Sequence, residues 1–174
     1  LSNLRQRREI IDEAIHSLGG RIFGSAGDSV IAEFASPVRA VEAAVNIQAK
    51  MQAINENLPE HQRMKFRVGV NIGDVMVSES NLYGDSVNIA ARLEAAAKPE
   101  GVCIAKSVFD LVSQKLKLSF EPLGELMLKN IDRPIEAYSV AATKNPGRYI
   151  QNFGEPLLKA EKAKPDSLAV MLFK

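Results

Sequence analysis

Three groups of polar residues in this sequence have the types and spacing to handle a phosphorylated ligand. The first is Asp28, which closes the glycine-rich segment 24–28 between two short runs of strand-forming residues. Gly27 lets the backbone turn tightly, so the Asp28 carboxylate can project from the tip as a hard oxygen ligand for Mg²⁺. An ordinary turn aspartate accounts equally well for this pattern, so both interpretations stay open.

The second and third groups are potential phosphate donors. Asn88 and Arg92 stand four residues apart in an alanine-rich segment that predicts a helix over 87–97, so they share one helical face. An amide and a fork-shaped guanidinium on one face can both donate to phosphate oxygens. Lys129, near the end of a predicted strand, can reach a polyphosphate as a point charge. Solvated helix charges and a strand-edge lysine are the alternatives.

The remaining polar candidates are weaker. Turn roles account for Asp74 and Asp85, and Cys103 is expected to be a core residue. His16 and His61 are lone histidines without the partner pattern of a triad or a zinc site. The single cysteine excludes an internal disulfide framework and a cysteine-rich zinc site, and it favours a reducing, cytoplasmic location.

The composition narrows the class of protein further. The chain has 174 residues, 46% of them hydrophobic, and a formal net charge of +1. This is ordinary for one globular domain and gives no reason to expect a nucleic-acid partner. No apolar run approaches the roughly 18 residues that span a bilayer, so we expect no membrane segment in this chain. Because the first residue is Leu1 rather than Met, we expect the sequence to be a fragment.

The elements that must position these residues follow an order of helix, hairpin, helix, hairpin, helix and then short mixed elements. This order predicts an α+β fold with a largely antiparallel sheet. The predicted helices cover 4–18, 36–54, 87–97 and 107–112, and the predicted strands cover 21–23, 29–34, 65–72, 75–77, 102–104, 120–123, 126–128 and 135–140. Residues 73 and 74 are expected to turn the strand 65–72 into the strand 75–77, and 80–86 are expected to form a loop.

Five motifs in order carry a resemblance to a known family. Segments 19–22, 27–34, 67–74, 83–94 and 123–138 together resemble the class III adenylate/guanylate cyclase catalytic domain of bacterial type, over about residues 4 to 140. The resemblance implies a ferredoxin-like core with a mainly antiparallel sheet and helices packed on it. It also implies a cytoplasmic signalling enzyme that makes a 3′,5′-cyclic nucleotide and pyrophosphate from ATP or another nucleoside triphosphate.

The resemblance also implies roles for single residues. Two catalytic domains pair head to tail, here as a homodimer, and the nucleotide lies at their interface with two Mg²⁺ or Mn²⁺ ions. By matching motif positions, Asp28 corresponds to a metal ligand, Asn88 and Arg92 to the pair that supports the transition state, and Lys129 to the phosphate-binding lysine.

The sequence departs from the family pattern in three ways. The opening strand with the first metal-binding aspartate is absent before Leu1, so Asp28 is the one expected metal ligand present. Two base-reading positions also differ, because Gly24 stands in place of a lysine and Asn81 in place of an aspartate. An amide both donates and accepts, so Asn81 can face adenine or guanine. Two functions therefore remain open: a cyclase with relaxed base choice, and a degenerate cyclase domain that regulates or dimerises.

The domain organisation follows from the same comparison. We expect a cyclase catalytic domain over residues 1–142 and, because of its proline, glycine and lysine content, an extended linker or arm over 143–166. Residues 167–174 read as an apolar strand. That strand either opens a next domain or fills the slot of the missing strand, in its own chain or swapped into a partner.

Overall fold

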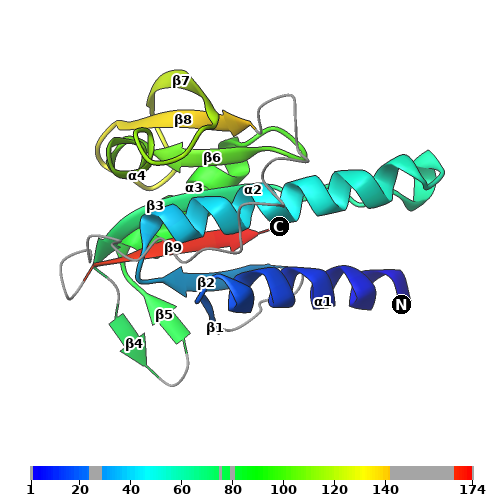
Figure 1. Ribbon diagram of the computed structural model, residues 1–174. Helices are drawn as coiled ribbons and strands as arrows, with labels where there is room; N and C mark the ends of the chain where they lie inside the picture. Colours follow the sequence, from blue (N-terminus) through cyan, green and yellow to red (C-terminus); the bar gives the residue numbers. More distant parts are fainter. Residues whose placement is uncertain (1, 24–28, 75, 79–80, 142–166, 174) are drawn as a thin grey trace.

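A computed structural model describes residues 2–23, 29–74, 76–78, 81–141 and 167–173 of the chain (Figure 1). The helices are α1 (Ser2–Ser17), α2 (Pro37–Glu56), the short 3₁₀ helix η1 (Glu60–Gln62), α3 (Asp85–Ala96) and α4 (Lys106–Val112). The strands are β1 (Arg21–Phe23), β2 (Val30–Phe34), β3 (Val68–Asp74), β4 (Met76–Ser78), β5 (Asn81–Tyr83), β6 (Val102–Ala105), β7 (Ser119–Leu126), β8 (Ile135–Ala141) and β9 (Ser167–Phe173).

One seven-stranded sheet forms the centre of the fold, in the order β1-β2-β9-β3-β6-β8-β7. Among these strands β3 and β6 run parallel, and every other neighbouring pair is antiparallel. The predicted α+β class with a mainly antiparallel sheet is confirmed. A separate two-stranded hairpin, β4 with β5, projects from one end of the sheet (Figure 1).

Successive side chains of β3 point to opposite faces of the sheet, and their contacts show which helix lies on which face. Val68 and Val70 are fully buried in the main core, where residues of α1, α2 and α4 also lie. Gly69 lies between these two valines, so it faces the other way and meets α3. Among the described helices, α1, α2 and α4 therefore cover one face of the sheet and α3 packs on the other (Figure 1).

Local signals fix the start of α2 and the end of α1, as the sequence predicts. Ser36 caps α2, because its Oγ accepts a hydrogen bond from the Arg39 N–H at 3.4 Å, and Pro37 takes the first helical position. After α1 the chain turns through Gly19 at φ 78°, and the Gly20 N–H bonds back to the Ile15 carbonyl at 2.9 Å. None of the helices described is long and apolar enough to cross a membrane.

A buried polar junction ties α1 to α2. The Arg7 side chain is fully buried, and it donates to Asn55 Oδ1 at 3.2 Å and to the sulfur of Met51 at 3.5 Å. Asn55 in turn donates to the Met64 carbonyl at 2.7 Å and to Glu100 Oε1 at 3.2 Å. Burial lowers the pKa of Arg7. These bonds hold the helix pair and two loops together, far from the β4–β5 end of the sheet.

The structure corrects three expectations of strand pairing. β3 does not turn at residues 73 and 74 into a hairpin with the next strand, because β3 pairs with β6 and β9 while β4 pairs with β5. The expected loop over 80–86 contains β5, and α3 already begins at Asp85. β7 is one strand over Ser119–Leu126, where two were expected, because a bulge between Pro122 and Gly124 lets the pairing with β8 continue.

β9 lies in the middle of the sheet. It pairs antiparallel with β2 from Val30 to Phe34 and with β3 from Val68 to Asp74. In this structure the segment 167–173 is thus a strand of the same sheet as β2 and β3. The expected linker, 143–166, lies outside the described residues, and the division into domains stays a prediction.

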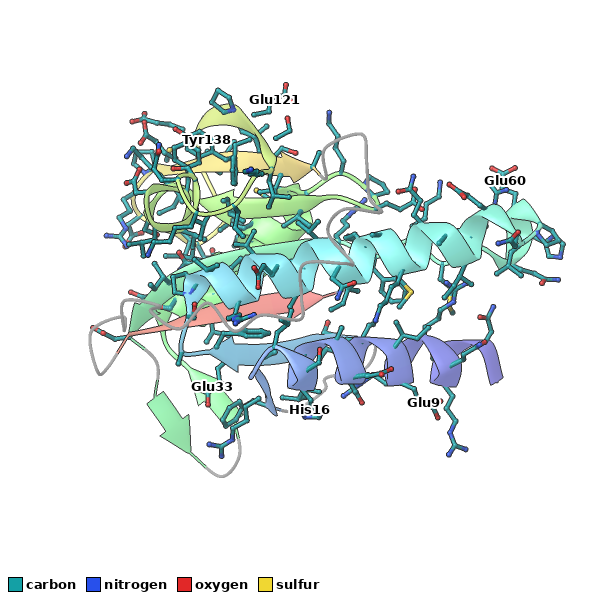
Figure 2. The ribbon with its side chains drawn as sticks, in the orientation of Figure 1. Glu9, His16, Glu33, Glu60, Glu121 and Tyr138 are labelled. Carbon is teal, nitrogen blue, oxygen red and sulfur yellow. The ribbon has the colours of Figure 1, made fainter. Side chains whose placement is uncertain are left out.

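Glu33 on β2 is a half-buried acid in this sheet (Figure 2). Its side chain is 14% exposed and its nearer oxygen is 3.8 Å from Arg21 Nη1. Its other oxygen, Oε2, is buried and has no hydrogen-bond partner among the described residues. Burial raises the pKa of Glu33, and the charge of Arg21 offsets this only in part.

This raised pKa predicts a pH dependence of stability. A folded protein that holds the proton more tightly than the unfolded chain loses stability as the pH rises above the ordinary glutamate value of 4.5. We expect Glu33→Gln to raise the free energy of unfolding at about pH 7.5 by about 1 kcal/mol, and to change it little at about pH 4. Urea denaturation at both pH values measures the difference.

Glu9→Gln is the control, because the Glu9 side chain is 69% exposed in a surface pair with Arg5. We expect no measurable change for it at either pH. A loss of stability in Glu33→Gln at about pH 7.5 would show that the carboxylate is favourable where it lies, contrary to the burial argument.

Candidate active site

The site is built on the contact between α3 and β3. At Gly69 the two backbones approach so closely that a Cβ atom there would lie 2.2 Å from the Ala90 carbonyl oxygen and 2.4 Å from the Glu94 nitrogen. Both neighbours are backbone atoms of the helix and cannot swing away. Glycine is therefore required for α3 to lie directly on the strand.

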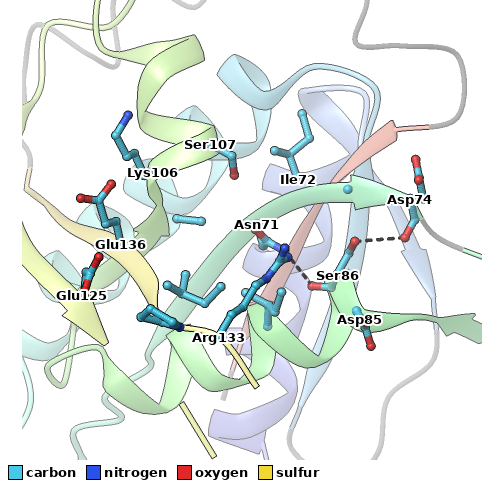
Figure 3. Close-up of a pocket in the computed structure, with 15 residues that line it drawn as sticks. Asn71, Ile72, Asp74, Asp85, Ser86, Lys106, Ser107, Glu125, Arg133 and Glu136 are labelled. Atoms are coloured by element: carbon cyan, nitrogen blue, oxygen red, sulfur yellow. Dashed lines mark hydrogen bonds between the residues drawn. The ribbon is translucent and has the colours of Figure 1, made fainter. Parts of the chain in front are cut away.

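Two hydrogen bonds hold the first turn of α3 on the same strand (Figure 3). Asn71, which is 5% exposed, donates from Nδ2 to the Ser86 carbonyl at 3.2 Å. The Ser86 hydroxyl donates to the Asp74 carbonyl at 3.0 Å. A Cβ atom on Gly73 would lie 2.1 Å from the Ser86 Oγ, so this position also needs glycine for the hydroxyl to fit. Positions 69, 71 and 73 thus share the strand face that carries α3.

Asn88 and Arg92 lie on the part of α3 that these contacts hold. Asn88 is exposed and Arg92 is half-buried, while their neighbours Ile89 and Leu93 are buried. The four-residue spacing on a helix puts the amide and the guanidinium on one face. The predicted helix and the shared face are confirmed, and the roles of the two side chains stay predictions.

The turn that carries Lys129 packs against the same helix. Lys129 is exposed in a turn after β7, closed by a hydrogen bond from the Ile131 N–H to the Leu128 carbonyl at 3.1 Å. Leu128 and Ile131 pack on the cluster that contains Ile89 and Leu93 of α3. The structure therefore brings the Lys129 turn and α3 together through a shared apolar cluster.

The other predicted site residues are only partly described. Asn81 is the first residue of β5, where it pairs with Ser78 in the projecting hairpin. Gly24 and Asp28 lie outside the described residues. Within the described parts of the chain, no group of three or more His, Cys, Asp or Glu side chains could hold a metal ion. The donor set for a two-metal site is therefore not complete there.

A cleft of about 770 Å³ opens beside the first turn of α3 (Figure 3). Asn71, Asp85 and Ser86 line it from one side, and Arg133 lies across it. Lys106 also lines the cleft, but its Nζ contacts the Asp110 carboxylate at 2.8 Å, and this bond raises the pKa of Lys106. The polar contacts that hold α3 thus lie at the wall of an open cleft.

Comparison with known proteins identifies the family. The model of the adenylate and guanylate cyclase catalytic domain matches residues 4–142. The chain belongs to the class III cyclases. The predicted family is confirmed, and so is a cyclase fold.

Individual relatives agree with this assignment. The chain is 39% identical over 166 residues to the Rhizobium meliloti protein named "Putative adenylate cyclase 3". The match covers 95% of this chain and 28% of that protein. It is 30% identical over 130 residues to the uncharacterized Mycobacterium tuberculosis protein Rv2212, covering 75% of this chain and 32% of that one. The chain therefore spans less than a third of the length of these curated relatives.

Solved structures show the same fold. The crystal structure of an adenylate/guanylate cyclase/hydrolase from Silicibacter pomeroyi matches with a TM-score of 0.73 and 38% identity, over 78% of this chain and 80% of that one. The adenylyl cyclase CyaB of P. aeruginosa matches with a TM-score of 0.67 at 19% identity, over 82% of each chain, which supports the fold alone.

Sequence reasoning missed the residues that hold α3. Gly69, Asn71 and Gly73 recur with the two-residue period of a strand, and the polar Asn71 interrupts an apolar run. That pattern was a signal for a closely packed polar contact on one face of the strand.

Cys103 lies under this site and yields a test of the packing. Its side chain is 1% exposed in the cluster that holds Ile89 and Leu93, and burial raises the pKa of its thiol to about 11. The prediction of a core cysteine is confirmed. Because thiolate is the reactive form, we expect the native thiol to be inert to an aromatic disulfide reagent at about pH 8 and to react fully in denaturant. Stoichiometric reaction of the native protein within minutes would contradict this packing.

Proposed function

We propose that this chain is the catalytic domain of a nucleotide cyclase that converts ATP or GTP to a 3′,5′-cyclic nucleotide and pyrophosphate. The observation that carries the proposal is the rigid seating of α3 on β3. This seating presents Asn88 and Arg92 on one face, with the Lys129 turn packed against the same helix. Membership of the class III cyclases supports the reaction class.

The reaction needs stabilisation of charge on the phosphates. The 3′-oxygen of the ribose forms a bond to the α-phosphorus, and the bond from that phosphorus to the oxygen bridging to the β-phosphate breaks. Pyrophosphate leaves with that electron pair, and the proton of the 3′-hydroxyl passes to water. Charge builds on the oxygens of the α-phosphate in the transition state, so fixed donors directed there lower the barrier.

The chemistry of each donor side chain suits a different part of the nucleotide. The Arg92 guanidinium can give two parallel N–H bonds to phosphate oxygens, and the Asn88 amide can hold a ribose or phosphate oxygen. Lys129 supplies a compact positive charge for the outer phosphates. Because Asn88 and Arg92 share one helix that is held on β3, the backbone fixes where the two side chains start relative to each other.

Metal ions and a partner subunit complete the proposal. Class III cyclases generally use divalent metal ions, which lower the barrier by neutralising charge on the phosphates. We propose Asp28 as a ligand of Mg²⁺ or Mn²⁺ and a homodimer in which the second copy completes the site. We also propose a cytoplasmic signalling role for the cyclic nucleotide.

Arg92→Ala provides the first test. With ATP or GTP and Mg²⁺ or Mn²⁺, the intact protein is expected to form cyclic nucleotide. Loss of the guanidinium should lower kcat about 100- to 1,000-fold, as loss of one transition-state donor does. Lys98→Ala serves as the control, since Lys98 is an exposed cation just beyond the end of α3. Cyclic nucleotide is measured by chromatography, and equal activity of Arg92→Ala and wild type would remove Arg92 from the mechanism.

The base positions favour a second function, a regulatory or dimerisation domain with little activity. Gly24 has no side chain to donate to a base, and Asn81 replaces the expected acid. Each lost polar contact costs about 1–3 kcal/mol of base discrimination.

The double variant Gly24→Lys/Asn81→Asp separates the two functions. If the chain is a cyclase, we expect this variant to raise kcat/KM for ATP over GTP by about 10-fold or more, because an acid and an amine then face the base. The wild-type protein should discriminate less between ATP and GTP than the double variant does. If neither protein forms cyclic nucleotide from either substrate, the enzyme proposal fails and the regulatory function is left.

A further inference from the structure

Asn71 and Ser86 lie outside the set of residues expected to touch nucleotide, yet they make the polar contacts between β3 and the first turn of α3. Asn71 is 5% exposed and Ser86 is 8% exposed, so little of either side chain is open to water. A buried polar group that loses its partner is costly, so these two bonds favour one placement of the helix over others.

The glycines at positions 69 and 73 make that placement specific along the helix axis. The helix backbone between Ala90 and Glu94 rests on Gly69, and Ser86 fits over Gly73. One residue of sliding moves a helix by about 1.5 Å. Such a slide would break the bond from Asn71 to the Ser86 carbonyl at 3.2 Å and the bond from Ser86 to Asp74 at 3.0 Å.

The same contacts set the position of the proposed transition-state donors. Asn88 follows Ser86 by two residues, and Arg92 lies between Ala90 and Glu94, the two residues that rest on Gly69. A shift of about 1 Å at a reacting group can lower the rate about 100-fold. The strand would therefore control the position of the donors through the helix.

We propose that Asn71 and Ser86 are positioning residues that fix α3 along β3 and so place Asn88 and Arg92 for the transition state. This inference rests on the proposed function, because it concerns the placement of donors in a cyclase. It adds two residues, from a strand and from a helix start, that the phosphate-binding pattern does not include.

Asn71→Ala tests the inference, with Gln48→Ala as a matched control. Gln48 is also a buried amide, 8% exposed, and its Nε2 donates to the carbonyls of Phe66 and Gly101 at 2.9 Å. It lies on α2, on the opposite face of the sheet. Both variants should lower Tm, but only Asn71→Ala should lower kcat, by about 10- to 100-fold with KM changed less than about 3-fold.

Two further variants separate positioning from general damage. Ser86→Ala removes only the bond to Asp74 and should lower kcat by about 3- to 10-fold, which keeps the test open if Asn71→Ala does not fold. In the Arg92→Ala background, Asn71→Ala should lower kcat by a smaller factor than it does in wild type, since one of the two donors that it places is already gone. The inference is overturned if Asn71→Ala lowers kcat by the same factor in both backgrounds, or if a folded Asn71→Ala protein has wild-type kcat. In either case the cyclase proposal stands.

Amide hydrogen exchange supplies a readout that does not depend on activity. Asn71→Ala should increase exchange over residues 85–92, and Gln48→Ala should not. If wild type forms no cyclic nucleotide, the proposed function fails, and exchange alone then decides whether Asn71 fixes α3. Equal exchange over 85–92 in both variants overturns the inference.

Discussion

The close approach of the α3 backbone to Gly69 is the constraint on which the site depends. A helix normally packs on a sheet through side chains, at about 10 Å. Here the carbonyl of Ala90 and the nitrogen of Glu94 lie where a Cβ atom of residue 69 would be. The helix is therefore close enough for the short amide of Asn71 to reach the Ser86 carbonyl. The small residues Ala90 and Ala91 follow from the same requirement, because α3 must fit against the sheet with little space.

The fold was predictable where one residue type decides the local structure. Ser36 with Pro37 begins a helix and Gly19 with Gly20 ends one, because a side-chain cap and a positive φ depend on those residues alone. Pairing of strands was less predictable. β3 was expected to form a hairpin with the strand after it, yet its partners β6 and β9 come much later in the chain. Strand partners depend on which apolar faces meet in three dimensions, and local sequence carries little information on that.

The candidate site was also predictable from the sequence only in part. The spacing of Asn88 and Arg92 predicted their shared face, because a helix has a fixed period. The proximity of the Lys129 turn to α3 depends on packing of Leu128 and Ile131 across the sheet, which spacing alone does not reveal. Asn71 was missed because its proposed role depends on the helix that packs on it. A single asparagine in a strand matches no recognisable sequence motif. The sequence therefore led more readily to the residues proposed to touch substrate than to the residues that hold them in place.

The parallel pairing of β3 with β6 has a consequence for how this domain folds. β3, α3 and β6 form a strand–helix–strand unit into which the β4–β5 hairpin is inserted, and α3 packs on both strands. Contacts within such a unit are short-range compared with those that bring β9 between β2 and β3. Shorter-range contacts cost less chain entropy to close, so this unit can form before β9 enters the sheet. The helix that carries Asn88 and Arg92 would then be seated on β3 before the central sheet is complete.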